Sequence, residues 1–290
     1  MIIDVNDRKQ WDNNTNSISE KDIFYKNNFA RTQKQSRQYV YKIKNNIVIF
    51  PYSLRNDVIL SFRYGGIIYR RFDRKFFDRA ISGLFKYCSK NNIKRIIIRK
   101  HPFLKTVKLG NIIKKEPFVF IDLSHDIDRL HRDIITAHMK RINKALMKGL
   151  NFSESCDVEY LNIFYKFYST MMKKNNVPCQ KISYFASLFL YLKKNLKFIC
   201  VKYRRELIAI SIILISGRNI FMMYGGMNNT GYEKYAKYFM IYQLMLKYKK
   251  RGYSRLVLGT GVDGKNDSVY LFKKGFTDTE SYIYTYGADI

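Results

Sequence analysis

The sequence predicts an α/β protein made of two mixed α/β domains in tandem, at residues 1–148 and 149–290. Three observations support this prediction. The chain has 290 residues, which is long for one compact domain and suits two domains of roughly 100–200 residues each. Hydrophobic residues make up 47% of the chain, enough for two cores. Both halves alternate strand-like and helix-like segments, a pattern typical of mixed sheets flanked by helices.

The first domain begins with residues 1–35, which are polar and weakly patterned, so we expect little regular structure there. Apolar residues recur at helical spacing from residue 74 to residue 92 and predict an amphipathic helix. The remaining apolar segments of this half are bounded by turn residues such as Gly65-Gly66. They predict strands at 39–43, 46–52, 57–64, 67–72, 93–99 and 117–123.

One long helix is predicted between the domains, from an N-cap at Ser124 to a stop at Gly149. The second domain then follows a similar plan. Helices are predicted at 158–174, 183–194, 232–251 and 266–274. Strands are predicted at 196–203, 206–216, 219–226, 254–260 and 281–286.

The composition limits the classes of function. With 53 basic and 23 acidic residues, the net charge is +30, which attracts nucleic acid, anionic lipid surfaces or phosphate-bearing substrates. Lysine accumulating on the surface of a protein from an AT-rich genome would give the same charge. No apolar run is long enough for a transmembrane segment and no signal peptide is visible, so we expect a cytoplasmic protein. The four cysteines are widely spaced and the four histidines form no metal motif, so we expect reduced thiols and no metal.

Three stretches resemble known acyltransferases. These are "FIDLSHDIDRLHRDIITAHMKRINKALMKGLNF", "YGGMNNTGYEKYAKYFMIYQLMLKYKKRGYSRLVLGT" and "LFKKGF". Together with the order of elements, they resemble FemAB-like proteins, in which two GNAT-like (acyl-CoA N-acyltransferase-like) domains lie in tandem. The resemblance covers residues 117–290 well. It implies a Fem-type aminoacyl or acetyl transferase.

The sequence departs from that family at three places. Residues 175–183 are too few for the helical arm found in many Fem proteins that use aminoacyl-tRNA. His101-Pro102 stands where many of them have an acidic residue before proline. The acetyl-CoA fingerprint of GNAT enzymes is replaced by "GGMNNTGYEK". The missing arm favours acyl-CoA, chiefly acetyl-CoA, as the donor, and the charge of +30 leaves aminoacyl-tRNA open.

Two motifs of the second domain suggest a site. Gly225 and Gly226 precede a helix, and the backbone N–H groups of such a junction suit a phosphate or an oxyanion. Lys273 stands where the family has a Phe-Lys pair, which implies a fixed cation that stabilises charge formed during acyl transfer. Lys274 suits the end of a helix. Tyr224 lines the cleft or fills the core.

Four further residues are candidates for contacts with substrate. Arg141 and Lys144 belong to a basic cluster at the end of the interdomain helix, where they face either a phosphate-bearing substrate or solvent. His101 is a candidate general base, and an ordinary loop histidine is the alternative. Asp263 could touch substrate from the turn after a strand, although turn chemistry alone explains it.

We therefore predict an acyltransferase that moves an acetyl or aminoacyl group to an amine of a sugar or peptide in cell-envelope or polysaccharide biosynthesis. The acceptor would be a small molecule or a nucleotide- or lipid-linked sugar, with tRNA and an anionic membrane surface as further partners. Two alternatives stay open. One is an aminoacyl-tRNA-dependent peptidoglycan-bridge transferase, and the other is a non-catalytic nucleic-acid-binding protein that uses the basic and aromatic stretch 62–72.

Overall fold

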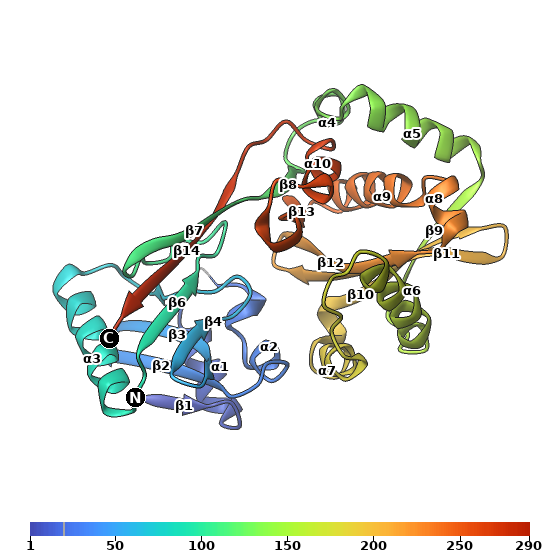
Figure 1. Ribbon diagram of the computed structural model, residues 1–290. Coiled ribbons are helices and arrows are strands. Elements are labelled where there is room, and N and C mark those ends of the chain that lie inside the picture. The colour runs from blue at the N-terminus through green and yellow to red at the C-terminus, as the bar shows by residue number, and fades with distance from the viewer. Residues whose placement is uncertain (20) are drawn as a thin grey trace. The chain divides into compact units, whose positions relative to one another are not determined.

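The computed structural model describes residues 1–19 and 21–290, which form two compact units (Figure 1). Unit 1 comprises Met1–Glu116 and Tyr282–Ile290, and unit 2 comprises Pro117–Ser281. The units therefore divide the chain at different points from the expected boundary at 148/149. Both contain a sheet with parallel and antiparallel pairs and flanking helices, which confirms the predicted α/β class.

Unit 1 is built on an eight-stranded sheet in the order β1-β2-β3-β4-β6-β14-β7, with β5 paired to β3. Its strands are β1 (Ile2–Asp4), β2 (Ser36–Ile43), β3 (Asn46–Arg55), β4 (Val58–Ser61), β5 (Ile68–Tyr69), β6 (Arg95–Arg99), β7 (Asn111–Pro117) and β14 (Tyr282–Asp289). Its helices are α1 (Arg8–Asn16), η1 (Ile23–Tyr25), α2 (Asn27–Ala30) and α3 (Arg74–Lys90).

The N-terminal residues are more ordered than predicted. β1 pairs with β2, and Trp11 of α1 is fully buried and donates its indole N–H to the carbonyl oxygen of Tyr25 at 2.9 Å. The expectation of a weakly structured 1–35 segment is therefore wrong. The segment 1–35 has few apolar residues, but several of them are large and aromatic. Burying these side chains supplies enough stabilisation to order the segment.

The segment 281–286, predicted as a strand, joins a different unit than expected. As β14 it pairs with β6 and lies between β6 and β7 in unit 1. The strand pattern of the sequence identifies such a segment but does not specify its partner.

Unit 2 is built on a six-stranded sheet in the order β8-β13-β12-β11-β10-β9. Its strands are β8 (Val119–Asp122), β9 (Leu150–Ser155), β10 (Leu196–Tyr203), β11 (Glu206–Ser216), β12 (Asn219–Met227) and β13 (Arg255–Gly259). Its helices are α4 (Ile127–Asp133), α5 (Thr136–Met147), α6 (Tyr160–Lys174), α7 (Ile182–Leu192), η2 (Lys193–Asn195), α8 (Asn229–Glu233), α9 (Ala236–Lys250), η3 (Val262–Gly264) and α10 (Ser268–Lys274).

The helices of unit 2 cover both faces of its sheet. α5, α9 and α10 lie on one face, where α9 contributes Phe239, Leu244 and Tyr248 to the core (Figure 1). α6 and α7 lie on the opposite face, where Phe164 packs against Phe185 and Phe198. No helix among residues 1–19 and 21–290 is long and apolar enough to cross a membrane.

The single helix predicted at 124–149 is two helices, α4 and α5, so this prediction is wrong in detail. The chain leaves the helical conformation at Ile134 and Ile135, whose ψ angles are 123° and 147°. At that point the N–H of Ile135 donates to the carbonyl oxygen of Gly275, just after α10. Asp126, rather than Ser124, caps α4 by accepting the N–H of Arg129 at 2.7 Å. A tertiary contact thus interrupts a segment that is helical by its apolar spacing.

Candidate functional site

The site begins where β12 and β13 separate. The two strands pair in parallel only where Asn219–Phe221 faces Arg255–Val257. β12 continues along β11 as far as Met227. Among the described residues, the other edge of β12 has no strand partner after Phe221. The site therefore lies beside a part of β12 that no neighbouring strand covers on this edge.

A β-bulge determines which side chains of β12 face α9. The register with β11 shifts so that Ile212 and Ile213 face Tyr224 and Met222, which leaves Met223 as an extra residue. A bulge reverses the alternation of the strand that follows. Gly225 consequently lies on the α9 face, opposite Ser211 of β11.

Gly225 provides the space for a buried polar contact. A Cβ atom at this position would lie only 2.1 Å from Ser211 Oγ and 3.0 Å from Lys237 Nζ. Lys237, in the first turn of α9, donates to Ser211 Oγ at 2.9 Å. Ser211 is fully buried. The glycine therefore allows the lysine amine to reach down to the sheet.

Lys273 of α10 approaches the same place from the end of β13. Its Nζ donates to the carbonyl oxygen of Thr260 at 2.6 Å. Burial, reinforced by the positive charge of Lys273, lowers the pKa of Lys237 to about 7. We call Lys237, Lys273, Ser211 and Gly225 the two-lysine site. Near neutral pH Lys237 is therefore partly an uncharged amine, which can accept a proton within electrostatic reach of a second lysine.

The sequence analysis did not identify Lys237. A lysine in the first turn of a helix is normally a surface charge, and nothing in "EKYAKYF" distinguishes it from Lys234. The available signal was Ser211, the one hydroxyl within the apolar run "LIAISIILI", because a buried hydroxyl requires a polar partner.

Gly225 and Gly226 lie inside β12, as the predicted strand 219–226 implies, and not at the junction with the helix that follows. Gly226 faces α6, where a Cβ atom would lie 2.4 Å from the carbonyl carbon of Phe167. The helix start that follows, α8, is occupied by its own cap, since Asn228 Oδ1 accepts the N–H of Gly231 at 2.9 Å. These glycines serve close packing, and Gly225 adds room at the two-lysine site.

Tyr224 lies on the opposite face of the sheet from Lys237. Its ring packs edge-on against Tyr168, Tyr184 and Phe185 at centroid distances of 5.8, 6.1 and 5.1 Å. Of the two expected roles for Tyr224, the structure therefore favours core filling over a place beside Lys273.

The two basic candidates of α5 differ in their surroundings. Arg141 donates to the hydroxyl of Tyr238 at 3.0 Å, and the ring of Tyr238 packs against Phe272 of α10 at 5.0 Å. Lys144 is exposed at the surface. Arg141 is thus attached to the elements that hold the two-lysine site, whereas Lys144 suits the solvent-facing alternative.

His101 belongs to unit 1 and is fully buried. Its Nδ1 accepts the N–H groups of Phe103 and Leu104 at 3.1 and 3.0 Å, and its Nε2 lies 3.3 Å from Asp22. Nδ1 is therefore committed within the fold and Nε2 faces the buried Asp22, which supports the structural alternative over a general base. Asp263 is exposed in the turn after β13 with a φ of 51°, a conformation that aspartate tolerates in turns.

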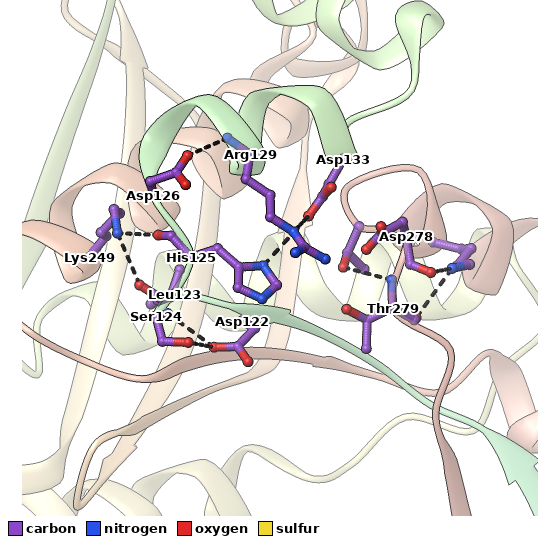
Figure 2. A network of polar contacts seen from close by, with 12 residues as sticks. Asp122, Leu123, Ser124, His125, Asp126, Arg129, Asp133, Lys249, Asp278 and Thr279 are labelled. Atoms are coloured by element: carbon purple, nitrogen blue, oxygen red, sulfur yellow. Dashed lines mark hydrogen bonds and ion pairs between the residues drawn. The ribbon is translucent and has the colours of Figure 1, made fainter.

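Figure 2 shows the polar network around the Asp122-Leu123-Ser124 element. Asp122 accepts both the N–H and the hydroxyl of Ser124, at 3.0 and 2.7 Å. Lys249 of α9 donates to the carbonyl oxygens of Leu123 and His125. Asp122 and Ser124 bond each other while the carbonyls bond Lys249, so this element anchors the start of α4 to α9. No group of three or more His, Cys, Asp or Glu that could hold a metal ion occurs in the described parts of the chain.

His138 connects α5 to α10 and was also absent from the predictions. Its Nε2 donates to the carbonyl oxygen of Phe272 at 2.8 Å, and its ring lies so close to Gly275 that a Cβ there would be 2.5 Å from it. Burial lowers the pKa of His138, which favours its neutral form. His138 thereby holds α10, and with it Lys273, against α5.

Known proteins with this architecture were found by structure and not by sequence. A scan of protein-family models and a search of curated proteins found no match. FemX superposes with a TM-score of 0.70 over 96% of this chain and 95% of its own, at 12% identity. A domain assigned to a lysylphosphatidylglycerol synthetase of Agrobacterium fabrum gives 0.63 over 96% and 91%, at 10% identity. A tandem GNAT protein of clavulanic acid biosynthesis gives 0.52 over 88% and 82%, at 7% identity.

These likenesses span nearly the whole chain and establish its architecture at low sequence identity. The chain has the FemAB-like, tandem GNAT fold that its sequence resembled.

Proposed function

We propose that this protein is an acyltransferase that transfers an acetyl or aminoacyl group to an amine of a sugar or peptide. The observation that carries this proposal is the two-lysine site, which lies where β12 and β13 separate. Lys237, whose pKa is lowered to about 7, and Lys273 supply a proton acceptor and a cation next to each other. Acyl transfer to an amine needs both functions.

The two lysines would have different roles in the reaction. The acceptor amine attacks the carbonyl carbon of the donor, a C–N bond forms, and the carbonyl oxygen becomes an oxyanion. The ammonium of Lys273 would stabilise that oxyanion, and the neutral amine of Lys237 would take the proton released by the attacking nitrogen. Collapse of the intermediate breaks the bond to the thiol or hydroxyl leaving group, which takes up a proton. Ser211 would hold Lys237 in position through its hydroxyl.

A phosphate-bearing donor is supported by lysines around α8. Lys148 lies over the ring of Tyr235 at 4.9 Å, Lys234 over Tyr203 at 4.8 Å, and Lys174 over Tyr232 at 5.0 Å. Because aromatic rings order these long side chains, the ammonium groups are placed in advance for phosphate oxygens. Acyl-CoA, chiefly acetyl-CoA, is the donor we propose, and aminoacyl-tRNA is the alternative with the same phosphate chemistry.

A role in building the cell envelope or a polysaccharide is the finer part of this proposal. Among the similar structures, the synthetase domain has a name that specifies a lysyl group joined to a membrane phospholipid. An amine on a sugar, a peptide or a nucleotide- or lipid-linked precursor is an acceptor of matching chemistry. The resemblance to Fem-type proteins supports the same class.

The proposal is tested by measuring acyl transfer with Lys273→Ala. Purified protein is incubated with acetyl-CoA, or with charged tRNA, and a panel of amino sugars and lysine-containing peptides, and products are detected by mass spectrometry. Direct detection avoids a thiol reagent, which would also react with the exposed Cys156 and Cys179. Loss of the cation should lower kcat about 100- to 1,000-fold, the usual effect of removing one oxyanion partner.

Lys274→Ala is the matched control, because its Nζ donates to the carbonyl oxygens of Asp278 and Thr279 in the chain after α10. It should keep full activity. Absence of transfer with every donor, or equal rates in the wild type and the Lys273→Ala variant, would contradict the proposal.

The nucleic-acid alternative loses one of its supports. Of the aromatic residues in the stretch 62–72, Phe62 and Tyr64 are each only 3% exposed and belong to the core. A stacking surface for unpaired bases needs such rings at the surface. Salt-dependent RNA binding that persists in the Lys273→Ala variant, together with no acyl transfer, would restore this alternative.

A further inference from the structure

Phe72 of unit 1 presents a large aromatic side chain to solvent and is more exposed than Tyr282 of the same unit, which is 44% exposed. Phe72 is 59% exposed and lies in the connection between β5 and α3. Its ring is backed by Tyr69 and Phe77 at centroid distances of 5.6 and 6.1 Å. It therefore projects from a packed aromatic base rather than from a loosely held loop.

A pocket of about 340 Å³ opens beside this ring between α3 and the segment 107–109. Its apolar lining comes from Phe72, Phe77, Ile81, Val107 and Leu109, and its polar lining from Arg74, Asp78 and Lys108. The hollow is thus apolar inside and has basic side chains among its walls.

Basic side chains surround Phe72 in the sequence. Residues 70–79 contain five arginines and lysines and two aspartates. Arg70, Arg71 and Lys75 are exposed. Both aspartates are used within the fold, since Asp73 caps α3 by accepting the N–H of Phe76 at 2.6 Å and Asp78 accepts from Arg74 at 3.1 Å. This surface therefore keeps an excess of positive charge.

The edge strand β7 also combines exposed apolar side chains with exposed lysines. It starts two residues after Leu109 of the pocket and is the last strand in the order of its sheet. Ile112 and Ile113 are 56% and 44% exposed, and both are followed by the exposed Lys114 and Lys115. Two neighbouring segments thus offer apolar side chains at the surface among lysine and arginine.

We propose that this face, which we call the Phe72 face, docks unit 1 onto an anionic lipid bilayer. Phe72 would enter the boundary between headgroups and acyl chains, and the pocket would receive an apolar group from the lipid. Arg70, Arg71 and Lys75 would lie among the negatively charged headgroups. Exposed aromatic residues amid lysine and arginine are the combination by which peripheral proteins bind such surfaces.

The arrangement favours lipid over RNA or a folded protein. Apart from the two rings, the apolar walls of the pocket come from Ile81, Val107 and Leu109, and such aliphatic walls do not stack or hydrogen-bond a base. A basic excess matches the negative potential of an anionic leaflet. The Phe72 face lies in unit 1, so this inference does not depend on the two-lysine site of unit 2.

Vesicle binding of the full-length protein tests the proposal. We expect co-sedimentation with vesicles of phosphatidylglycerol and phosphatidylcholine, weak binding to phosphatidylcholine alone, and less binding as salt is raised. Arg70→Gln/Arg71→Gln should weaken binding about 25-fold, because each basic residue near such a surface contributes about fivefold. Phe72→Ser should also weaken it, with the salt dependence retained.

Unit 2 offers a matched control at Leu190, Lys193 and Lys194, a 72% exposed leucine near two exposed lysines. Leu190→Ser and Lys193→Gln/Lys194→Gln should bind like the wild type. Phe72→Trp adds a direct readout, since its new emission should shift to shorter wavelength with anionic vesicles, while Leu190→Trp should show no shift.

Three outcomes would overturn the proposal. They are no preference for anionic vesicles, equal losses in the Phe72-face and control variants, and an unshifted emission from Phe72→Trp in bound protein. Binding of single-stranded RNA that the Arg70→Gln/Arg71→Gln change abolishes, with no vesicle binding by the wild type, would assign the face to RNA instead.

Discussion

Unit 2 contains two clusters of basic side chains that differ in the charge of the groups around them. In the first, Glu154 of β9 accepts from Lys197 at 3.0 Å and Arg251 at 3.0 Å, and lies 3.4 Å from Lys247. In the second, Lys237 bonds a neutral hydroxyl and experiences the positive charge of Lys273. Lysine is thus neutralised by a carboxylate in one place and opposed by another cation in the other.

The two clusters also differ in what lowers the pKa of their central group. Burial raises the proton affinity of Glu154, but its bonds to Lys197 and Arg251 outweigh burial and lower its pKa. Burial and Lys273 act in the same direction on Lys237 and lower its pKa to about 7. The Glu154 cluster stabilises the fold. The two-lysine site costs stability, and Lys237 is the base of the proposed reaction; perturbed proton affinities of this kind are common at functional sites.

The largest expected effect is on activity. Lys237→Met should lower kcat/KM about 1,000-fold, within the range for loss of a general base. In the wild type, kcat/KM should rise as the pH passes about 7, because Lys237 loses its proton there. Lys237→Arg, which keeps a positive charge at every pH, should be as inactive as the methionine variant.

Lys250→Met, at the exposed end of the same helix, is the control for that experiment and should have the wild-type pH profile. An active arginine variant would show that Lys237 acts as a cation, and the contrast between the two clusters would then lose its functional meaning.

A smaller effect is expected on stability when the space at Gly225 is filled. In Gly225→Ala the new methyl group meets Ser211 Oγ at 2.1 Å, so unfolding should require about 3 kcal/mol less free energy. Ser211→Ala in the same chain removes that oxygen and should restore part of the loss. Chemical denaturation of the single and double variants measures this coupling. Additive losses would mean that the two residues do not share the tight contact described.

The smallest expected effect is on stability, when a lysine is replaced by methionine in each of the two clusters. Lys197→Met should destabilise the protein by about 1 kcal/mol at pH 6, where Glu154 is ionised, and much less at pH 3.

Lys237→Met should instead raise the melting temperature at pH 6, because it removes a buried charge. The unfolded lysine keeps its proton up to about pH 10.5, so this gain should be constant below pH 7 and shrink between pH 7 and 10.5. Thermal melts at these pH values check both signs. If both variants changed stability at pH 6 in the same direction, the two clusters would not differ in the way described.

The sequence predicted the elements whose boundaries are local. β10, β11 and β12 were expected at 196–203, 206–216 and 219–226, because tight turns and β-branched residues define them. The interruption at Ile134 and Ile135 was missed, because it depends on the contact with Gly275 across the fold.

The site was predictable only in part for the same reason. Lys273 was found through a resemblance of motif. Lys237 depends on a bulge at Met223 that turns Gly225 toward α9, and on a burial that no local pattern reveals. The partner of β14 likewise lies far away in the chain.

The position of β14 has a consequence for how the protein is made. The sheet of unit 1 has β14 in its interior, between β6 and β7, although its other strands all precede residue 118. During translation the first unit to be started is therefore the last to be completed, since the place between β6 and β7 stays open until residues 282–289 have left the ribosome. Until then the backbone edges of β6 and β7 lack their partner, so a nascent chain of this protein would depend on chaperones for longer than one whose domains close in order.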